Sequence, residues 1–410
     1  MTGEHRARRA RRGRPGWWTV AAVVGAVVLA ATGVIVWLTV GNPGQGRPSA
    51  APATLGSTTG RPSAGPGTPT SSSSAQPAPW LAPAPASLRG QLRPGSDPSV
   101  LPSMVLIADK LNNRLIVVDQ YGRLRWQFPR PGDLAPGQVF KIPDDAFFTP
   151  DGRFIIATEE DNYVISVISV ATHHIVYRYG VPGSPGSGPN HLDNPDDAIV
   201  LPDGAILVAD IKNCRLLLIS KGSHRPARIY GQTTPYCLHA PPARWGSPNG
   251  AFPMRNGHFL VTEINGDWVD ELGLNGHVYW SVHPPAVSYP SDTNEIVPGR
   301  YLTVDYSQPG QVVIFDRAGR TLWRFHGTGA NALNHPSLAL PLPNGDVILN
   351  DDFNHRVIVI DPSTDRIVWQ YGVTGVAGKA AGYLNNPDGI DLVPPDSLLQ
   401  RIPPGKVTSP

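Results

Sequence analysis

The chain has 410 residues, and its 45 Pro and 43 Gly are spread between short apolar runs, which argues against long helices and favours many strands joined by turns. The formal net charge is +2, but six Arg and one Glu within residues 1–14 contribute +5, so the rest of the chain sums to −3. No basic patch remains there to indicate a nucleic-acid partner.

The N-terminal region has the pattern of a membrane anchor. An Arg-rich segment, residues 1–16, precedes an uncharged apolar segment, residues 17–40, with Trp near both ends. A bilayer core of about 30 Å requires roughly 20 such residues in a helix, so residues 17–40 are predicted to form one transmembrane helix. The Arg cluster would hold residues 1–16 in the cytoplasm and place the rest of the chain outside the cell membrane. The alternative is a cleaved signal peptide, whose apolar region is usually about 7–15 residues long.

The next segment has a different composition. Residues 41–98 consist almost entirely of Pro, Ser, Thr, Ala and Gly. Such a segment cannot bury enough apolar surface to offset the entropy lost on ordering, so it is predicted to be a disordered linker. A repeating pattern follows, and residues 99–399 are predicted to form one folded domain with a tail at 400–410.

The folded domain is built from repeats. Six segments begin with Pro, at spacings of 52, 53, 42, 46 and 51 residues: Pro143, Pro195, Pro248, Pro290, Pro336 and Pro387. Each Pro opens a short strand, which is followed by a turn, a hairpin and an outer strand. Four strands in roughly 45–50 residues correspond to one blade of a β-propeller.

The two ends of the repeat complement each other. The first hairpin, residues 106–119, has no Pro-initiated strand before it, and the last such strand, residues 387–393, has no hairpin after it. If the last strand completes the first blade, the ring closes and loses its open edge. The sequence therefore predicts an all-β fold, a six-bladed β-propeller closed by the C-terminal strand.

The hairpins carry a recurring Asp-x-x-Asn-x-Arg phrase that resembles the centre of an NHL repeat. It occurs as Asp109/Asn112/Arg114, Asp210/Asn213/Arg215 and Asp351/Asn354/Arg356. Residues 371–389, YGVTGVAGKAAGYLNNPDG, resemble the loop that precedes such a repeat, and outer-strand phrases such as residues 124–126 and 367–369 resemble quinoprotein-like propellers. The NHL resemblance covers about residues 104–393. It implies a propeller, and the family includes protein- and RNA-binding modules and a few metal-dependent lyases. A quinone cofactor is the weaker alternative, because the adjacent Cys pair often seen in such sites is missing.

Five blades place a carboxylate just before the hairpin turn, at Asp109, Asp210, Glu263, Asp305 and Asp351, and blade two has Glu159 beside that position. Where Asn and Arg follow, the acid is expected to hold the turn through hydrogen bonds and an ion pair. Glu263 and Asp305 lack that Arg, so they are candidate catalytic residues.

A second ring is formed by the residue after each Pro, and we call these six residues the mouth ring: Asp144, Asp196, Asn249, Ser291, Ser337 and Asp388. The strand they open should lie innermost, so they are expected to surround one mouth of the central channel as a ligand-binding site. Carboxylates suit a hard cation, and Asp144, Asp196 and Asp388 are candidate ligands of a divalent cation such as Ca²⁺. The alternative is that short polar residues simply begin strands and solvate a wet channel.

Histidines and cysteines complete the candidates. His191 and His335 lie in corresponding loops before two of the strands, where an imidazole could act as base, acid or ligand, although ordinary loop residues remain the alternative. His173 and His174 are expected to face solvent in an outer turn. Cys214 and Cys237 are expected to form a disulfide outside the membrane. Zinc binding through sulfur is not expected, because further ligands are missing nearby.

Two functions fit these features. The first is a membrane-anchored, extracytoplasmic NHL-like propeller that acts as a binding module for a protein or glycan. The second is a metal-dependent lyase or hydrolase at the channel mouth, acting through His191, His335 and nearby carboxylates.

Overall fold

The structure is a computed structural model that describes residues 91–401. The predicted cytoplasmic tail (1–16), the predicted transmembrane helix (17–40), most of the predicted linker and residues 402–410 lie outside the described residues. Between residues 91 and 401, no helix is long and apolar enough to cross a bilayer.

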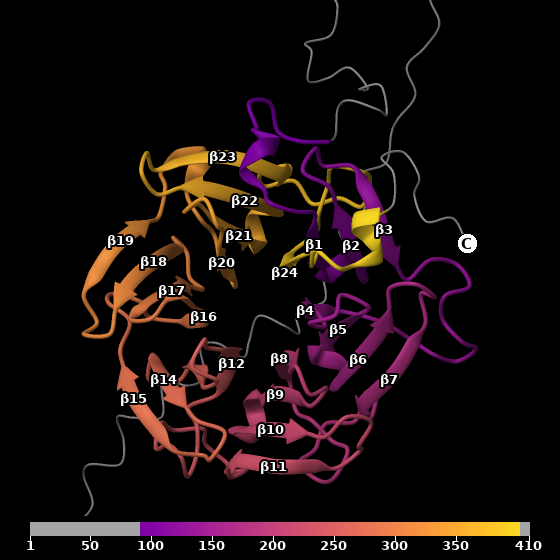
Figure 1. The fold of residues 1–410 in the computed structure, drawn as a ribbon, viewed down its shortest axis with the longest axis vertical. Helices are drawn as coiled ribbons and strands as arrows, with labels where there is room; N and C mark the ends of the chain where they lie inside the picture. The colour runs from indigo at the N-terminus through magenta and orange to yellow at the C-terminus, as the bar shows by residue number, and fades with distance from the viewer. Residues whose placement is uncertain (1–90, 402–410) are drawn as a thin grey trace, which may run out of the picture. The chain divides into compact units, whose positions relative to one another are not determined.

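Residues 91–401 contain six four-stranded antiparallel sheets, which are the blades of a β-propeller (Figure 1). Blade one consists of β24 (Pro387–Leu392), β1 (Val105–Asp109), β2 (Arg114–Val118) and β3 (Leu124–Phe128). Blade two consists of β4 (Pro143–Phe148), β5 (Phe154–Glu159), β6 (Val164–Ser169) and β7 (Ile175–Gly180). Blade three consists of β8 (Pro195–Val200), β9 (Ile206–Asp210), β10 (Arg215–Ile219) and β11 (Pro226–Gly231).

The remaining blades follow the same order from the inner to the outer strand. Blade four consists of β12 (Pro248–Pro253), β13 (Phe259–Glu263), β14 (Trp268–Leu272) and β15 (Val278–Val282). Blade five consists of β16 (Pro290–Val297), β17 (Arg300–Asp305), β18 (Gln311–Asp316) and β19 (Thr321–Phe325). Blade six consists of β20 (Ala339–Pro341), β21 (Val347–Asp351), β22 (Arg356–Asp361) and β23 (Arg366–Gly372).

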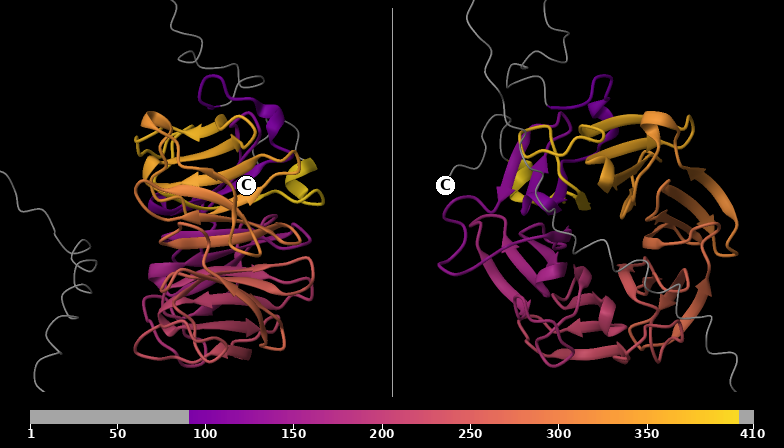
Figure 2. Two further views of the ribbon diagram at one scale, coloured as in Figure 1. Left: turned by 90° about the vertical axis from the view of Figure 1, so that its left-hand side faces the viewer. Right: turned by 180° about the vertical axis from the view of Figure 1, so that it is seen from behind.

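The ring closes as predicted. The C-terminal strand β24 pairs with β1, with Val105 opposite Leu392 and Ile107 opposite Ile390. In Figure 1 and Figure 2 the yellow end of the domain accordingly lies beside its indigo beginning. The prediction of an all-β, six-bladed propeller closed by its last strand is confirmed for the described residues.

Outer-strand tryptophans join neighbouring blades. The indole of Trp126 in blade one donates to Val170 O in blade two at 3.1 Å, and the indole of Trp369 in blade six donates to Gln120 O in blade one at 2.8 Å. Both side chains are almost fully buried. A buried Trp contributes a large apolar area and needs a partner for its N–H, and the adjacent blade supplies both. The phrases that resemble quinoprotein-like propellers therefore contribute to packing between blades.

Two expectations about the periphery are wrong. His173 is only 3% exposed, because its turn folds over blade one, where its ring lies 5.1 Å from that of Trp126. Residues 91–98 were assigned to the linker, but they lie along the edge of β23, where Arg93 N donates to Gln370 O and Asp97 N donates to Val368 O. An exposed strand edge offers unpaired backbone groups, and this segment satisfies some of them.

Candidate functional site

The six carboxylates at the hairpin turns, which we call the turn acids, share one structural role. Each accepts a hydrogen bond from a backbone N–H of the loop that leads into its blade; the acid–donor pairs are Asp109–Asn385, Glu159–Lys141, Asp210–Asp193, Glu263–Gly246, Asp305–Tyr289 and Asp351–Asn334. Each turn acid therefore ties its hairpin to the preceding loop. This confirms the structural role predicted for the acids of blades one, three and six.

The catalytic candidates Glu263 and Asp305 belong to this set. Glu263 lacks the usual Arg, but His239 Nδ1 lies 2.9 Å from its Oε1. Asp305 receives a hydrogen bond from Gln311 Nε2 at 2.9 Å instead. In both blades another side chain thus takes the place of the missing Arg.

All six residues of the mouth ring line one cavity of about 120 Å³. They are joined there by five residues from the loops: Lys110, Glu160, Ile211, Tyr289 and Tyr306. The inner strands of neighbouring blades begin side by side around the axis, so residues far apart in sequence meet at this mouth (Figure 1). The structure thus brings the predicted ring together at one site.

Lys110 lies where a cation was expected. Its ammonium group contacts Asp144, lies 2.6 Å from Asp388 and lies 3.4 Å from Glu160. Burial lowers the pKa of Lys110, but the three carboxylates outweigh it and raise that pKa well above its usual range. Burial raises the pKa of Asp388, but the Lys110 charge and the hydrogen bonds to this carboxylate together outweigh burial and lower the pKa to about 2. Asp144 and Asp388 therefore already have a cationic partner.

An aromatic group borders the same mouth. The rings of Tyr289 and Tyr306, which line the cavity, have centroids 5.4 Å apart, and Tyr306 lies 4.9 Å from the ring of His335. Phe353 stacks beside His335 and is 47% exposed. Burial raises the pKa of both Tyr side chains and lowers that of His335, so all three are neutral at pH 7. The mouth thus combines polar groups with ring faces.

The structure separates the two candidate histidines. Neither histidine lines the cavity, but the ring of His335 lies 4.9 Å from that of Tyr306, which does. The His191 ring lies over its own loop, with Nδ1 3.0 Å from Pro189 O, and its carbonyl accepts a hydrogen bond from Arg215. The described residues therefore do not place the two imidazoles together in the lining of this cavity.

A second layer of carboxylates was missed by the sequence. The ligand-capable oxygens of Asp145, Asp196, Asp197 and Asp292, which we call the channel acid cluster, all lie within 4.8 Å of one another. Burial and the charge of Asp292 raise the pKa of Asp145 and of Asp197 well above the usual range, and burial raises that of Asp292 to about 8. The doubled Asp in Pro-Asp-Asp at residues 143–145 and 195–197 was the available signal.

A β-bulge explains why the second Asp also points inward. Pro143 pairs with Glu159 and Ala146 pairs with Ala157, so two residues of β4 stand opposite one residue of β5. The same shift occurs in blade three between Pro195 and Ala198. In a regular strand adjacent side chains point to opposite faces, but a bulge changes the direction of one of them.

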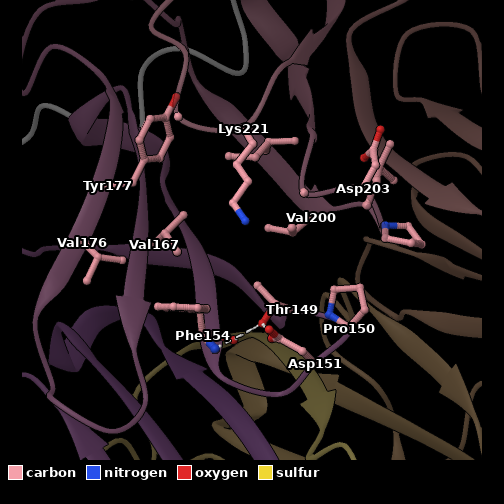
Figure 3. A pocket seen from close by; sticks show the side chains of 15 residues that line it. Thr149, Pro150, Asp151, Phe154, Val167, Val176, Tyr177, Val200, Asp203 and Lys221 are labelled. Atoms are coloured by element: carbon pink, nitrogen blue, oxygen red, sulfur yellow. Dashed lines mark hydrogen bonds between the residues drawn. The ribbon is translucent and has the colours of Figure 1, made fainter.

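A different kind of cavity lies between blades two and three. It has a volume of about 400 Å³ and apolar walls that include Phe154, Val167 and Val200. Figure 3 shows Lys221 extending over it and Thr149 hydrogen-bonded to Asp151 at its rim. Its lining comes from turns at the opposite strand ends from the mouth ring. It shares no residue with the polar cavity.

No protein-family model and no curated protein matches the chain. Solved structures of similar fold include a protein of unknown function from Bacteroides caccae, with 16% identity, 71% of this chain and 98% of that chain covered, and a TM-score of 0.48. A streptogramin B lyase is 18% identical, with a TM-score of 0.40; the alignment covers 58% of this chain and 74% of the lyase chain. The WD40 β-propeller domain of Doa1 is 13% identical, with a TM-score of 0.43; the alignment covers 65% of this chain and 81% of the Doa1 chain.

These neighbours are themselves functionally diverse, and at such identities and TM-scores they carry no argument about activity. The chain is a six-bladed β-propeller, and its function has to be argued from its own site.

Proposed function

We propose that this chain is a membrane-anchored, extracytoplasmic propeller that binds a glycan at its channel mouth. The observation that carries the proposal is the lining of one cavity by short carboxylate, amide and hydroxyl side chains together with the rings of Tyr289 and Tyr306. Sugars present hydroxyl groups around a ring and apolar C–H faces. Polar side chains can bond the former, and aromatic rings can pack against the latter.

The size and charge of the mouth limit which glycans can bind there. A cavity of about 120 Å³ is smaller than the roughly 300 Å³ at the lower end of small-molecule pockets, so it would accept one terminal group. The rest of the glycan would lie across the exposed ring of Phe353. Carboxylates outnumber the single ammonium of Lys110 at the mouth, which favours neutral or amino sugars and disfavours phosphates and uronic acids.

The location is supported by two features. The apolar segment at residues 17–40 is long enough for a membrane anchor, and an Arg-rich segment precedes it. Cys214 and Cys237 form a disulfide, which is typical of proteins outside the cytosol. The Asp-x-x-Asn-x-Arg hairpins of blades one, three and six support membership of the NHL-repeat class.

Binding of defined oligosaccharides to the purified full-length chain tests the proposal. Neutral, amino-sugar and uronic-acid oligosaccharides are the probes, and isothermal titration is the measurement. One neutral or amino-sugar class is expected to bind, and Ser337→Ala and Tyr306→Leu should each weaken it at least tenfold. Tyr279→Leu, at an exposed ring in blade four, is the matched control and should leave binding unchanged. No binding by any class, or equal binding by all variants, would refute the proposal.

A lyase or hydrolase at the same mouth is the second candidate, and the observation in its favour is His335, which lies against Tyr306 within reach of the mouth. Incubation with a bound oligosaccharide, with and without added divalent cation, distinguishes the two functions. Cleavage products that disappear in His335→Gln would establish catalysis, whereas unchanged oligosaccharide would leave a binding module.

A further inference from the structure

The channel acid cluster combines high burial with missing hydrogen-bond partners. Asp145, Asp197 and Asp292 are each at most 2% exposed. Among the described residues, neither oxygen of Asp197 or of Asp292 has a hydrogen-bond partner, and Oδ1 of Asp145 has none either. Buried carboxylates without donors are rare, because losing water without a replacement is costly. Either a proton shared between the carboxyl groups or a bound cation would satisfy them.

Their backbones are held firmly in position. Thr158 Oγ1 donates to Asp145 O at 3.2 Å, and Thr303 Oγ1 donates to Asp292 O at 2.9 Å. One oxygen of Asp196 accepts a hydrogen bond from Asn249 at 2.6 Å. These contacts hold residues of three blades in place, and their ligand-capable oxygens lie within 4.8 Å of one another and of those of Asp197.

A glycine keeps space between them. Blade four carries Gly250 where blades two, three and five carry the second acid of each bulge. A Cβ at Gly250 would collide with Asp292 Oδ1 and lie 2.7 Å from Asp197 Oδ2. Any larger residue would therefore displace the carboxylates, and the glycine preserves their close approach.

We propose that the channel acid cluster (Asp145, Asp196, Asp197 and Asp292) is a calcium-binding site beneath the mouth. Four carboxylates without a nitrogen or sulfur donor suit a hard cation, whereas zinc prefers nitrogen and sulfur ligands. The ligand oxygens all lie within 4.8 Å of one another, which is close enough for one cation to contact them. Ca²⁺ accepts six to eight oxygen ligands in flexible geometry, whereas Mg²⁺ demands a near-ideal octahedron, so an irregular carboxylate cluster favours Ca²⁺.

This site differs from the predicted one. The expected cation ligands are Asp144, Asp196 and Asp388, but Lys110 lies between Asp144 and Asp388. Asp196 belongs to both sites, since it lines the mouth cavity and is part of the cluster, so the cluster adjoins that cavity. The calcium site does not depend on glycan binding, and either can hold if the other fails.

Calcium titration of the purified full-length chain, after treatment with chelator, tests the proposal. Bound calcium is expected at one ion per chain, with tighter binding of Ca²⁺ than of Mg²⁺. A ligand that binds only the native state raises the melting temperature of the protein. Calcium at a concentration one hundred times its dissociation constant should therefore raise it by about 5 °C.

Asp197→Asn and Asp292→Asn are the test variants, because they keep shape while removing charge. Each should weaken calcium binding at least tenfold. Without calcium each should melt at or above the temperature of the wild type, since repulsion between carboxylates is reduced. Asp352→Asn removes another buried channel carboxylate, one bonded to Asn350, and is the control expected to change calcium affinity less than threefold.

The outcomes are decisive in either direction. Loss of calcium binding in both variants, with retained folding, supports the site. A wild-type chain that binds no calcium and melts identically with calcium and chelator overturns it, because the carboxylates must then share protons instead. Equal calcium binding by the wild type and both variants would place the ion elsewhere and would also overturn it.

Discussion

The turn acids and the channel acid cluster consist of the same functional group at similar burial, yet the hydrogen bonds that the two groups accept differ. Asp351 is fully buried, and it accepts hydrogen bonds from Asn334 N, Asn354 and Arg356. Asp197 is 1% exposed, and neither of its oxygens accepts a hydrogen bond from a backbone, amide, hydroxyl or cationic donor of the described chain. Burial alone does not distinguish the two groups, whereas hydrogen bonding does.

This difference in hydrogen bonding indicates which carboxylates stabilise the fold and which can bind a ligand. A buried ion pair that is surrounded by donors is expensive to break, because removing one partner leaves the other charged and dry. An unpartnered buried carboxylate lowers stability until something binds it. The turn acids therefore hold the fold together, and the channel acid cluster is available for a ligand.

The largest expected effect comes from breaking a turn pair. Arg356 is fully buried and donates to Asp351, so Arg356→Met should lower the free energy of unfolding by about 4 kcal/mol. Urea unfolding measures this change. Arg320→Met, at the exposed pair with Asp316, is the control and should leave the unfolding midpoint nearly unchanged. Similar losses in both variants would contradict the distinction.

An Asp→Asn substitution should change the free energy of unfolding differently in the two groups. Asp210→Asn removes the charge that pairs with Arg215, and it should lower the free energy of unfolding by about 2 kcal/mol. Asp197→Asn, measured without calcium, should not lower it at all. Chemical unfolding of both variants in chelator makes the comparison, and destabilisation of both would show that the channel acids are structural as well.

Asp270 is an intermediate case. It is fully buried, Ser281 donates to one of its oxygens, and the other oxygen, which faces Glu263 and His239, accepts no hydrogen bond. Burial, together with Glu263, raises its pKa from 3.8 to about 8. Above about pH 4 the native state keeps a proton that the unfolded chain has released, so stability falls as pH rises from about 4 to about 8.

Per pH unit, this dependence is the smallest predicted effect. The free energy of unfolding of the wild type, relative to that of Asp270→Asn, should fall by about 1.4 kcal/mol for each pH unit between pH 5 and pH 7. Urea unfolding of both proteins at three pH values measures it. A constant difference between them would show that Asp270 is ionised throughout this range.

Much of the site was predictable because it follows the repeat. The spacing of the six Pro-initiated strands predicted the blades, and equivalent positions in equivalent strands predicted that Asp144, Asn249 and Asp388 would meet at one mouth. The same reasoning failed for Glu263, since its substitute partner His239 comes from a loop that lies outside the repeat pattern.

The sequence by itself determined the number of blades, the closure of the ring and the role of the turn acids in blades one, three and six, because these depend on local patterns that recur along the chain. Only the tertiary structure decided which carboxylates face one another. A bulge turns Asp145 and Asp197 inward, and Lys110 reaches from blade one to neutralise Asp144 and Asp388. Register shifts and contacts across the axis join residues from different blades, and no local pattern encodes them.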